Sequence, residues 1–251
     1  MNLGASVDRI LSKLDEHLHK NDYVSAERHL VYWLDEATKA GDVRAELLIC
    51  NELMGLYRKL GREDDAIGCA ERALSVVDTN GIGAQVGAAT TYLNVATVYK
   101  AFGRAADGIG LFERAREIYE RELDTHDTRL AGLYNNAATA YTSAGDYAKA
   151  REFFNRALAI MLETENGECD AAITYLNLAD LTAAQKGAEN GEKEIEEYLD
   201  RAEELLEARK YESEGYYAFV CDKCAPVFTH YGRFFYGKEL KARAEEIYER
   251  A

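Results

Sequence analysis

A glycine recurs at a nearly fixed interval along the chain, and this repeat restricts the possible folds more than any other feature of the sequence. Three short segments each carry a tyrosine four residues before a glycine, and these glycines lie 42 residues apart. Steps of 42 and 45 residues reach two more glycines, and a step of 40 residues back reaches an asparagine. Glycine and asparagine most readily adopt the left-handed conformation that ends a helix. The six predicted turn positions are Asn21, Gly61, Gly103, Gly145, Gly187 and Gly232.

Small side chains recur at fixed distances from these glycines, seven residues before them and five and twelve residues after them. Apolar residues between the small ones follow helical spacing. Small residues let two helix axes approach closely, and one proline in 251 residues argues against a β fold. The pattern of each repeat therefore predicts a helix, a tight turn and a second antiparallel helix. A stack of such hairpins can bury apolar faces that a single hairpin leaves exposed. The small residues are Ala96, Ala138, Ala225, Ala66, Gly108, Ala150, Gly237, Ala73, Ala115, Ala157 and Ala244.

The pattern resembles the tetratricopeptide repeat (TPR) family over nearly the whole chain, most strongly over residues 43–165. The 42-residue spacing is similar to the kinesin-light-chain type of repeat. The resemblance implies an all-α fold, a right-handed superhelical solenoid of about six antiparallel helix hairpins. It also implies a single TPR-like domain over residues 1–251, in which the first helices of the hairpins line a concave groove.

Two segments depart from the regular repeat. The single proline, Pro226, falls inside the predicted first helix of the sixth repeat, where we expect it to kink that helix. In the fifth repeat, the residues from Gly187 to Gly191 predict a longer turn, because they include two glycines and an asparagine.

Three asparagines recur in the middle of predicted first helices, at Asn94, Asn136 and Asn177. They lie on the side opposite the apolar positions, beside small polar residues such as Thr97 and Thr139. Asparagine is a mediocre helix former, so helix propensity does not explain them. The amides can hold the backbone of an extended peptide, or they can tie neighbouring hairpins together. The family resemblance implies the first role, because equivalent asparagines line the inner groove of kinesin-light-chain-like repeats.

The predicted function is binding of an extended peptide or partner tail in this groove. Arg58, Lys59 and Lys100 are candidates to meet an acidic side chain of the ligand, and Asp180 a basic one. One alternative is a sensor of a small signalling peptide. Another is a homo-oligomeric scaffold, in which apolar residues of the last hairpin build a homodimer. Those residues are Phe234, Phe235 and Tyr236.

The net charge of −15 argues against nucleic-acid or anionic-membrane partners, because phosphate binding needs a basic surface. Residues 163–214 hold most of this charge, with 16 acidic residues against 5 basic ones. Two interpretations remain open for the stretch: a solvated outer face, or a docking surface for a basic partner.

No motif predicts catalysis, a cofactor or a metal site, so we expect a non-enzymatic protein. Cys221 and Cys224 form a C-x-x-C pair, but no second ligand pair accompanies it and both positions fall on the predicted core side of their helix. We therefore expect packed thiols. The odd count of 5 cysteines, the lack of a signal-peptide pattern and the lack of a long apolar stretch favour a cytoplasmic protein without a membrane span.

Overall fold

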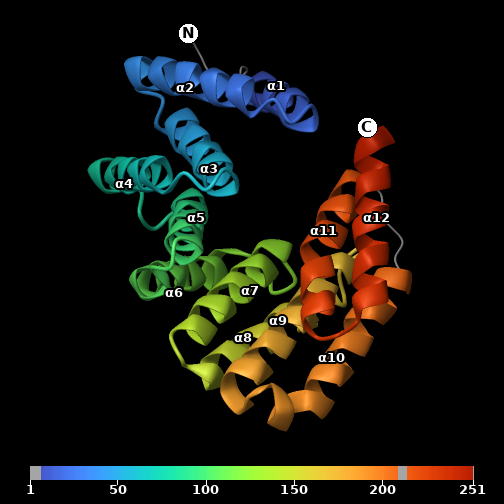
Figure 1. The fold of residues 1–251 in the computed structure, drawn as a ribbon. Helices are drawn as coiled ribbons and strands as arrows, with labels where there is room; N and C mark the ends of the chain where they lie inside the picture. The colour runs from blue at the N-terminus through green and yellow to red at the C-terminus, as the bar shows by residue number, and fades with distance from the viewer. Residues whose placement is uncertain (1–6, 209–213, 251) are drawn as a thin grey trace. The chain divides into compact units, whose positions relative to one another are not determined.

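The computed structural model describes residues 7–208 and 214–250. Within these ranges the chain forms helices and no strand, and successive helices pair into hairpins (Figure 1). The all-α prediction and the expected number of hairpins are confirmed. The helices are α1 (Val7–His19), α2 (Tyr23–Ala40), α3 (Val43–Lys59), α4 (Glu63–Thr79), α5 (Val86–Ala101), α6 (Ala105–Glu122), α7 (Thr128–Ser143), α8 (Tyr147–Met161), α9 (Glu168–Lys186), α10 (Ala188–Ala208), α11 (Glu214–His230) and α12 (Phe234–Arg250).

All six predicted turn residues have a positive φ angle, from 52° at Asn21 to 88° at Gly232. At Gly61, the amide donates to Arg58 O at 3.2 Å, and the next amide, that of Arg62, donates to Tyr57 O at 2.9 Å. These two bonds satisfy carbonyls that the helix end leaves open. A Cβ atom built on Gly61 meets nothing within 4 Å, so the backbone angle, and not the available space, requires glycine there.

The small residues allow close packing inside each hairpin. A Cβ atom on Gly108 of α6 would lie 3.0 Å from the carbonyl oxygen of Ala96 on α5. In the last hairpin, a Cβ atom on Gly237 would lie 2.8 Å from Ala225 O. Larger side chains at either glycine would push the paired helices apart.

The fifth hairpin corrects one expectation. Its turn is a single residue, Gly187, because α9 extends to Lys186 and α10 begins at Ala188. The prediction of a longer turn was therefore wrong. Gly191 belongs to the first turn of α10, where it lets α9 approach: a Cβ atom there would lie 2.8 Å from Thr182 Cγ2. In the sixth hairpin, α11 continues past Pro226 to His230.

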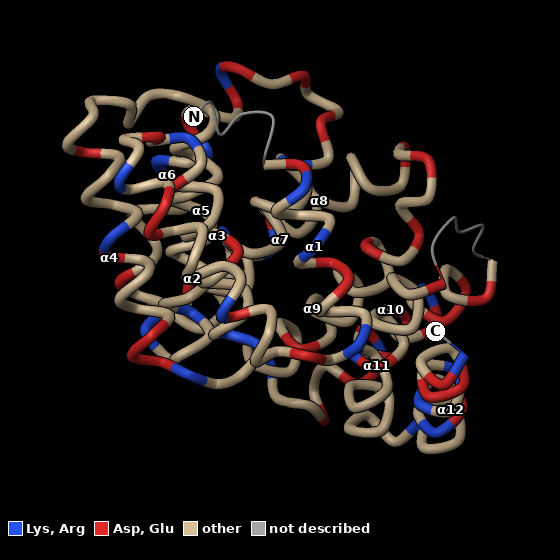
Figure 2. Tube along the Cα trace, turned by 90° about the horizontal axis from the view of Figure 1, so that it is seen from above, with Lys and Arg blue, Asp and Glu red and all other residues tan. Residues whose placement is uncertain are grey.

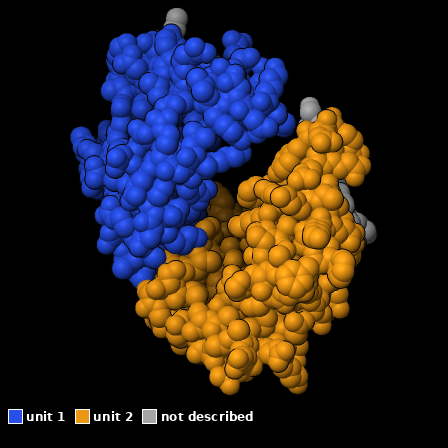
Figure 3. Space-filling model, in the orientation of Figure 1, with its two compact units in different colours: residues 1–122 blue, residues 123–251 orange. Residues whose placement is uncertain are grey.

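The chain divides into two compact units, residues 1–122 with α1 to α6 and residues 123–251 with α7 to α12 (Figure 3). Each unit has its own buried aromatic residues. In the first unit these include Tyr92 and Phe112, and in the second Tyr217 and Phe228. The single domain predicted over residues 1–251 stays a prediction.

Candidate functional site

In the first unit, a cavity of about 690 Å³ opens between α3 and α5. Its wall combines aliphatic side chains with polar and charged ones. Both helices are the first helices of their hairpins, the elements predicted to line the groove. The lining residues are Val43, Arg44, Leu47, Leu48, Asn51, Glu52, Ile82, Gln85, Gly87, Ala88, Thr90 and Asn94.

Helical spacing brings these residues to one wall. Arg44, Leu48 and Glu52 follow one another at intervals of four residues along α3, which places them on one side of the helix. The helix begins where Asp42 caps it, since the Asp42 carboxylate accepts a hydrogen bond from Ala45 N at 3.0 Å. On α5, Gly87 contributes no side chain, and a Cβ atom there meets nothing within 4 Å. The cavity is therefore open in front of Gly87.

Two amides in this cavity have unused hydrogen-bonding capacity. Asn51 Nδ2 donates to Thr91 Oγ1 at 3.3 Å, while the buried Asn51 Oδ1 atom has no partner in the described part of the chain. Asn94, which the sequence singled out, is half-buried and makes no side-chain hydrogen bond with any described residue. Buried polar atoms are normally paired, so an oxygen without a donor indicates a place for a ligand or water.

Two charged groups in the cavity also have no ion-pair partner among the described residues. Glu52 is half-buried, and burial raises the pKa of its carboxyl, with a smaller contribution from the charge of Asp15 on α1. Arg44 is exposed at the beginning of α3. The cavity therefore presents one positive and one negative group, separated by two turns of the same helix.

In the second unit, a smaller cavity of about 200 Å³ is lined by parts of α7, α9 and α11. Asn136 lies in its wall together with Asn135. On α11, the stacked rings of Tyr216 and Phe219 have centroids 6.1 Å apart, and Lys223 Nζ lies 6.0 Å from the Phe219 centroid. On its α11 side this wall therefore presents aromatic rings, which the wall of the first unit's cavity does not contain.

Asparagine–threonine contacts link neighbouring hairpins within each unit. In the second unit, Asn135 Oδ1 accepts from Asn177 Nδ2 at 2.9 Å and from Thr174 Oγ1 at 3.1 Å. In the first unit, the corresponding contact joins Asn51 and Thr91. Asn177 therefore has the hairpin-tying contact that the sequence left open as an alternative role. The sequence analysis missed Asn51 and Asn135, although both stand ten residues before a turn glycine.

The remaining predicted site residues lie outside both cavity walls. Thr97 and Thr139 donate their hydroxyls to carbonyls of their own helices, Leu93 O and Asn136 O, each at 2.8 Å. The structure therefore brings Asn94 and Asn136 to cavity walls, and it leaves the predicted charged residues elsewhere on the surface. Lys59 lies over the Tyr23 ring at 4.9 Å, Arg58 is exposed, Lys100 is half-buried, and Asp180 accepts from Tyr231 Oη at 2.8 Å.

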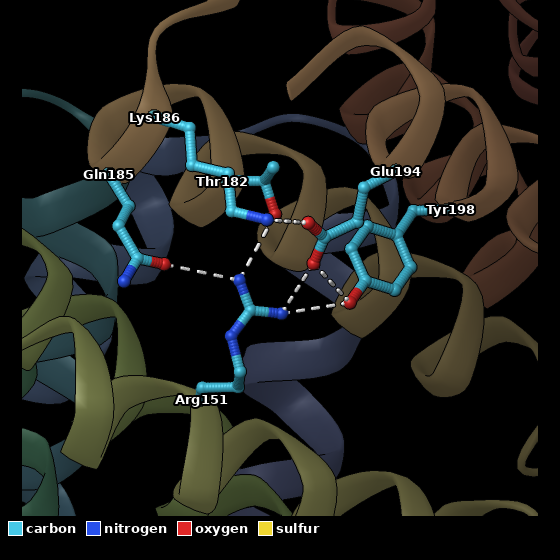
Figure 4. Close-up of polar contacts among 6 residues, drawn as sticks. All are labelled: Arg151, Thr182, Gln185, Lys186, Glu194 and Tyr198. Carbon is cyan, nitrogen blue, oxygen red and sulfur yellow. Dashed lines mark hydrogen bonds and ion pairs between the residues drawn. The ribbon is translucent and has the colours of Figure 1, made fainter. Parts of the chain in front are cut away.

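The acidic stretch has a third role that the sequence did not suggest. Acidic residues cover much of α10 (Figure 2), and several pair with arginines of the neighbouring hairpins. Arg151 of α8 donates to Glu194 at 2.8 Å and to Tyr198 at 2.9 Å, and Lys186 of α9 also reaches Glu194 (Figure 4). The carboxylates of α10 thus fasten the fifth hairpin to its neighbour.

On the other side of the fifth hairpin, Arg233 meets three acidic side chains of α10. It donates to Glu196 at 2.6 Å, to Glu203 at 2.8 Å and to Asp200. These pairs occupy carboxylates that the docking interpretation requires to be accessible to a basic partner.

The C-x-x-C pair lies in the core, as expected. Cys221 and Cys224 are fully buried, and burial raises the pKa of Cys224 to about 12. Across residues 7–208 and 214–250, no group of three or more His, Cys, Asp or Glu side chains could hold a metal ion. None of the described helices is both long and apolar enough to cross a membrane.

Comparisons with known proteins agree with the repeat pattern. Residues 87–163 match the family model described as tetratricopeptide repeat. The chain is similar to the crystal structure of BtubC (BKLC) from P. vanneervenii, with 27% identity, a TM-score of 0.70, and coverage of 84% of this chain and 87% of that one. No curated protein matches the chain.

A second solved structure shows the fold alone. It consists of the nearly identical TPR-like repeats of a putative kinesin light chain from Podosopora anserina, at 18% identity and a TM-score of 0.57. The match covers 81% of this chain and 95% of that one.

Proposed function

We propose that this chain, which carries tetratricopeptide repeats in a TPR-like fold, is a scaffold that binds an extended segment of a partner protein. TPR folds generally serve protein interaction, and the proposal assigns that role to the first helices of the hairpins. A small signalling peptide that the protein senses would use the same surface.

The observation that carries the proposal is the unused hydrogen-bonding capacity of the first unit's cavity. A peptide backbone offers an N–H donor and a C=O acceptor at each residue. Asn51 Oδ1 needs a donor, and the free amide of Asn94 can both donate and accept. An extended segment along α3 and α5 reaches Asn94 directly and Asn51 Oδ1 once the Asn51 amide turns toward the cavity, while its side chains enter the aliphatic part of the cavity.

The other predicted residues complete the proposal. Asn136 is proposed to contact the ligand in the second unit's cavity. Asn177 lies outside that cavity wall and is bonded to Asn135, so its contact with a ligand stays a prediction. The positions of Arg58, Lys59, Lys100 and Asp180 as contacts for charged side chains stay predictions, as do those of Thr97 and Thr139.

A cavity-filling variant tests the proposal without disturbing the fold. A leucine in place of Gly87 enters open space inside the cavity, because nothing lies within 4 Å of its Cβ position. The matched control is Gly110→Leu on α6, which also meets nothing within 4 Å and lies outside the cavity walls. Peptides selected from a random display library on the wild type should lose binding to Gly87→Leu and keep it on Gly110→Leu. Failure to select any peptide, or equal binding by both variants, contradicts the proposal.

Self-association is a second candidate, because the last hairpin exposes two adjacent phenylalanines. Phe234 is 58% exposed and Phe235 is 91% exposed at the beginning of α12. Burying these rings in a homodimer removes a large apolar area from water. Sedimentation of the wild type and of Phe235→Ser tests this: a dimer that becomes monomeric supports it, and a monomeric wild type rules it out.

A further inference from the structure

We infer that the first unit's cavity selects a segment with a basic and an acidic side chain on either side of an aliphatic one, with Glu52 receiving the basic side chain and Arg44 the acidic one. The inference rests on the proposed peptide-binding function, which it deepens by naming the ligand chemistry. It comes from groups that the folded chain leaves unpaired.

Two glutamates of α3 show why Glu52 needs a partner. Glu46 is the more buried, at 9% exposure, and Arg72 pairs with it through Nε at 2.9 Å and Nη2 at 2.7 Å. Glu52 lies six residues later on the same helix and is half-buried, but no described cation reaches it. A partly desolvated carboxylate without a cation is unfavourable in the free protein. A lysine or arginine of a bound segment would relieve this.

The surroundings of Glu52 strengthen its preference for a cation. Burial is the main cause that raises the pKa of Glu52, and the negative charge of Asp15 acts in the same direction. Burial removes water that would stabilise the charged carboxylate, and Asp15 repels its negative charge. A cation bound there is attracted by both carboxylates.

Arg44 supplies the opposite end of the site. It stands eight residues before Glu52, which corresponds to about 12 Å along a helix that rises about 1.5 Å per residue. An extended chain advances about 3.3 Å per residue, so its two charged residues should stand about three or four positions apart. Leu47 and Leu48 stand between the two charges along α3, and they line the cavity together with Ile82, which suits an aliphatic side chain.

The buried amide fixes where the backbone of the segment runs. Asn51 stands beside Glu52 in sequence, and its unpaired Oδ1 atom is buried in the same wall. Once the Asn51 amide turns toward the cavity, a backbone N–H near the basic residue of the segment provides the donor that this oxygen lacks. The site thus selects a charged side chain at each of its two ends and an aliphatic side chain between them.

The test uses a short fluorescent synthetic peptide with lysine and glutamate about four positions apart and a leucine between them. A second peptide replaces the lysine by glutamine. Anisotropy titrations should show that the wild type binds the lysine peptide at least about tenfold more tightly, a typical minimum for a desolvated charge pair. Glu52→Gln should bind both peptides equally. Arg44→Gln should keep the preference for lysine but weaken both complexes, because the glutamate loses its partner.

Three outcomes overturn the inference: equal binding of the two peptides by the wild type, a lysine preference that survives in Glu52→Gln, or binding of neither peptide. Glu63→Gln is the matched control, because Glu63 is exposed on α4 and lies outside the cavity. If library-selected peptides bind, are blocked by Gly87→Leu, and ignore Glu52→Gln, then the charge preference fails while the proposed function stands. If Gly87→Leu blocks no binder, both fail.

Discussion

Each of the two units contains an asparagine on one hairpin and a threonine and an asparagine, three residues apart, on the next hairpin, and the two trios are in opposite states. In the second unit, Asn135 turns its oxygen toward Thr174 and Asn177, so this one oxygen accepts hydrogen bonds from both. In the first unit, the trio is Asn51, Thr91 and Asn94. There the asparagine turns its nitrogen toward the threonine, its oxygen has no partner, and Asn94 stays free.

The difference teaches that a repeated polar motif need not repeat its role. The closed trio of the second unit ties two hairpins, and the open trio of the first unit leaves hydrogen-bonding groups for another molecule. The cavities agree with this, since the first is about 690 Å³ and the second about 200 Å³. Four substitutions can break or sharpen the comparison.

The largest effect is expected for Asn135→Leu. It removes the acceptor of Asn177 Nδ2 and leaves that half-buried donor unpaired. The free energy of unfolding should fall by about 1–3 kcal/mol, the usual cost of an unsatisfied buried group. Urea denaturation monitored by circular dichroism measures it. A change below about 0.5 kcal/mol would mean that the trio contributes little to stability.

Arg233→Gln should have the next largest effect, because it leaves Glu196, Asp200 and Glu203 without their shared cation. Since these carboxylates are partly exposed, water screens the repulsion and the loss should be about 1 kcal/mol. Added salt should reduce the loss, which thermal melts at low and high ionic strength will show. An effect independent of salt would contradict an electrostatic origin. The ion pair between Arg72 and Glu46 in the first unit can be tested in the same way, by replacing the arginine and comparing melts at low and high ionic strength.

Asn51→Leu should change stability by less than about 0.5 kcal/mol. It removes one long hydrogen bond of 3.3 Å, but it also removes the buried oxygen that has no partner, and these two effects oppose each other. Comparing the free energies of unfolding of Asn51→Leu and Asn135→Leu under the same conditions shows whether the open trio stabilises the fold less than the closed one. Equal losses in the two variants would show that both trios are structural ties.

Glu52→Gln should raise stability slightly at neutral pH, by a few tenths of a kcal/mol, as expected for a weakly unfavourable half-buried charge. Burial raises the pKa of Glu52 in the folded state, so the folded protein holds this proton more tightly than the unfolded chain. The contribution of Glu52 to the stability of the wild type therefore rises as the pH falls through that raised pKa. The advantage of the variant should shrink over the same range. Melting temperatures of both proteins between neutral and acidic pH test the sign, and a growing advantage at acidic pH would refute it.

The sequence predicts the hairpins well because each depends on local chemistry. A turn residue with positive φ has to be glycine or asparagine, so Asn21 and Gly103 are visible from their type and spacing alone. The fifth turn misled the prediction because Gly191 serves helix packing, a role that sequence spacing does not distinguish from a turn.

The state of the polar groups was not predictable in the same way. Asn51 and Asn135 are the same residue at the same distance from their turn glycines, yet the amides are rotated differently. Arg151 and Glu194 pair across 43 positions, and only the packing of hairpins reveals it. The cavity likewise depends on the distance between α3 and α5, and the residue types in the sequence do not predict that distance.

The spacing of the asparagine–threonine ties has a consequence for how such a chain can be lengthened or shortened. Asn51 and Asn135 are 84 residues apart, which corresponds to two hairpins and not one. Thr91 stands twelve residues before Gly103, and the same position before Gly145 holds Leu133. Deleting the α5–α6 hairpin would set Asn51 against a leucine, whereas deleting α5 to α8 would offer it Thr174, which stands thirteen and not twelve residues before its turn glycine. A single hairpin is therefore not an interchangeable part of this chain, although all hairpins share one fold.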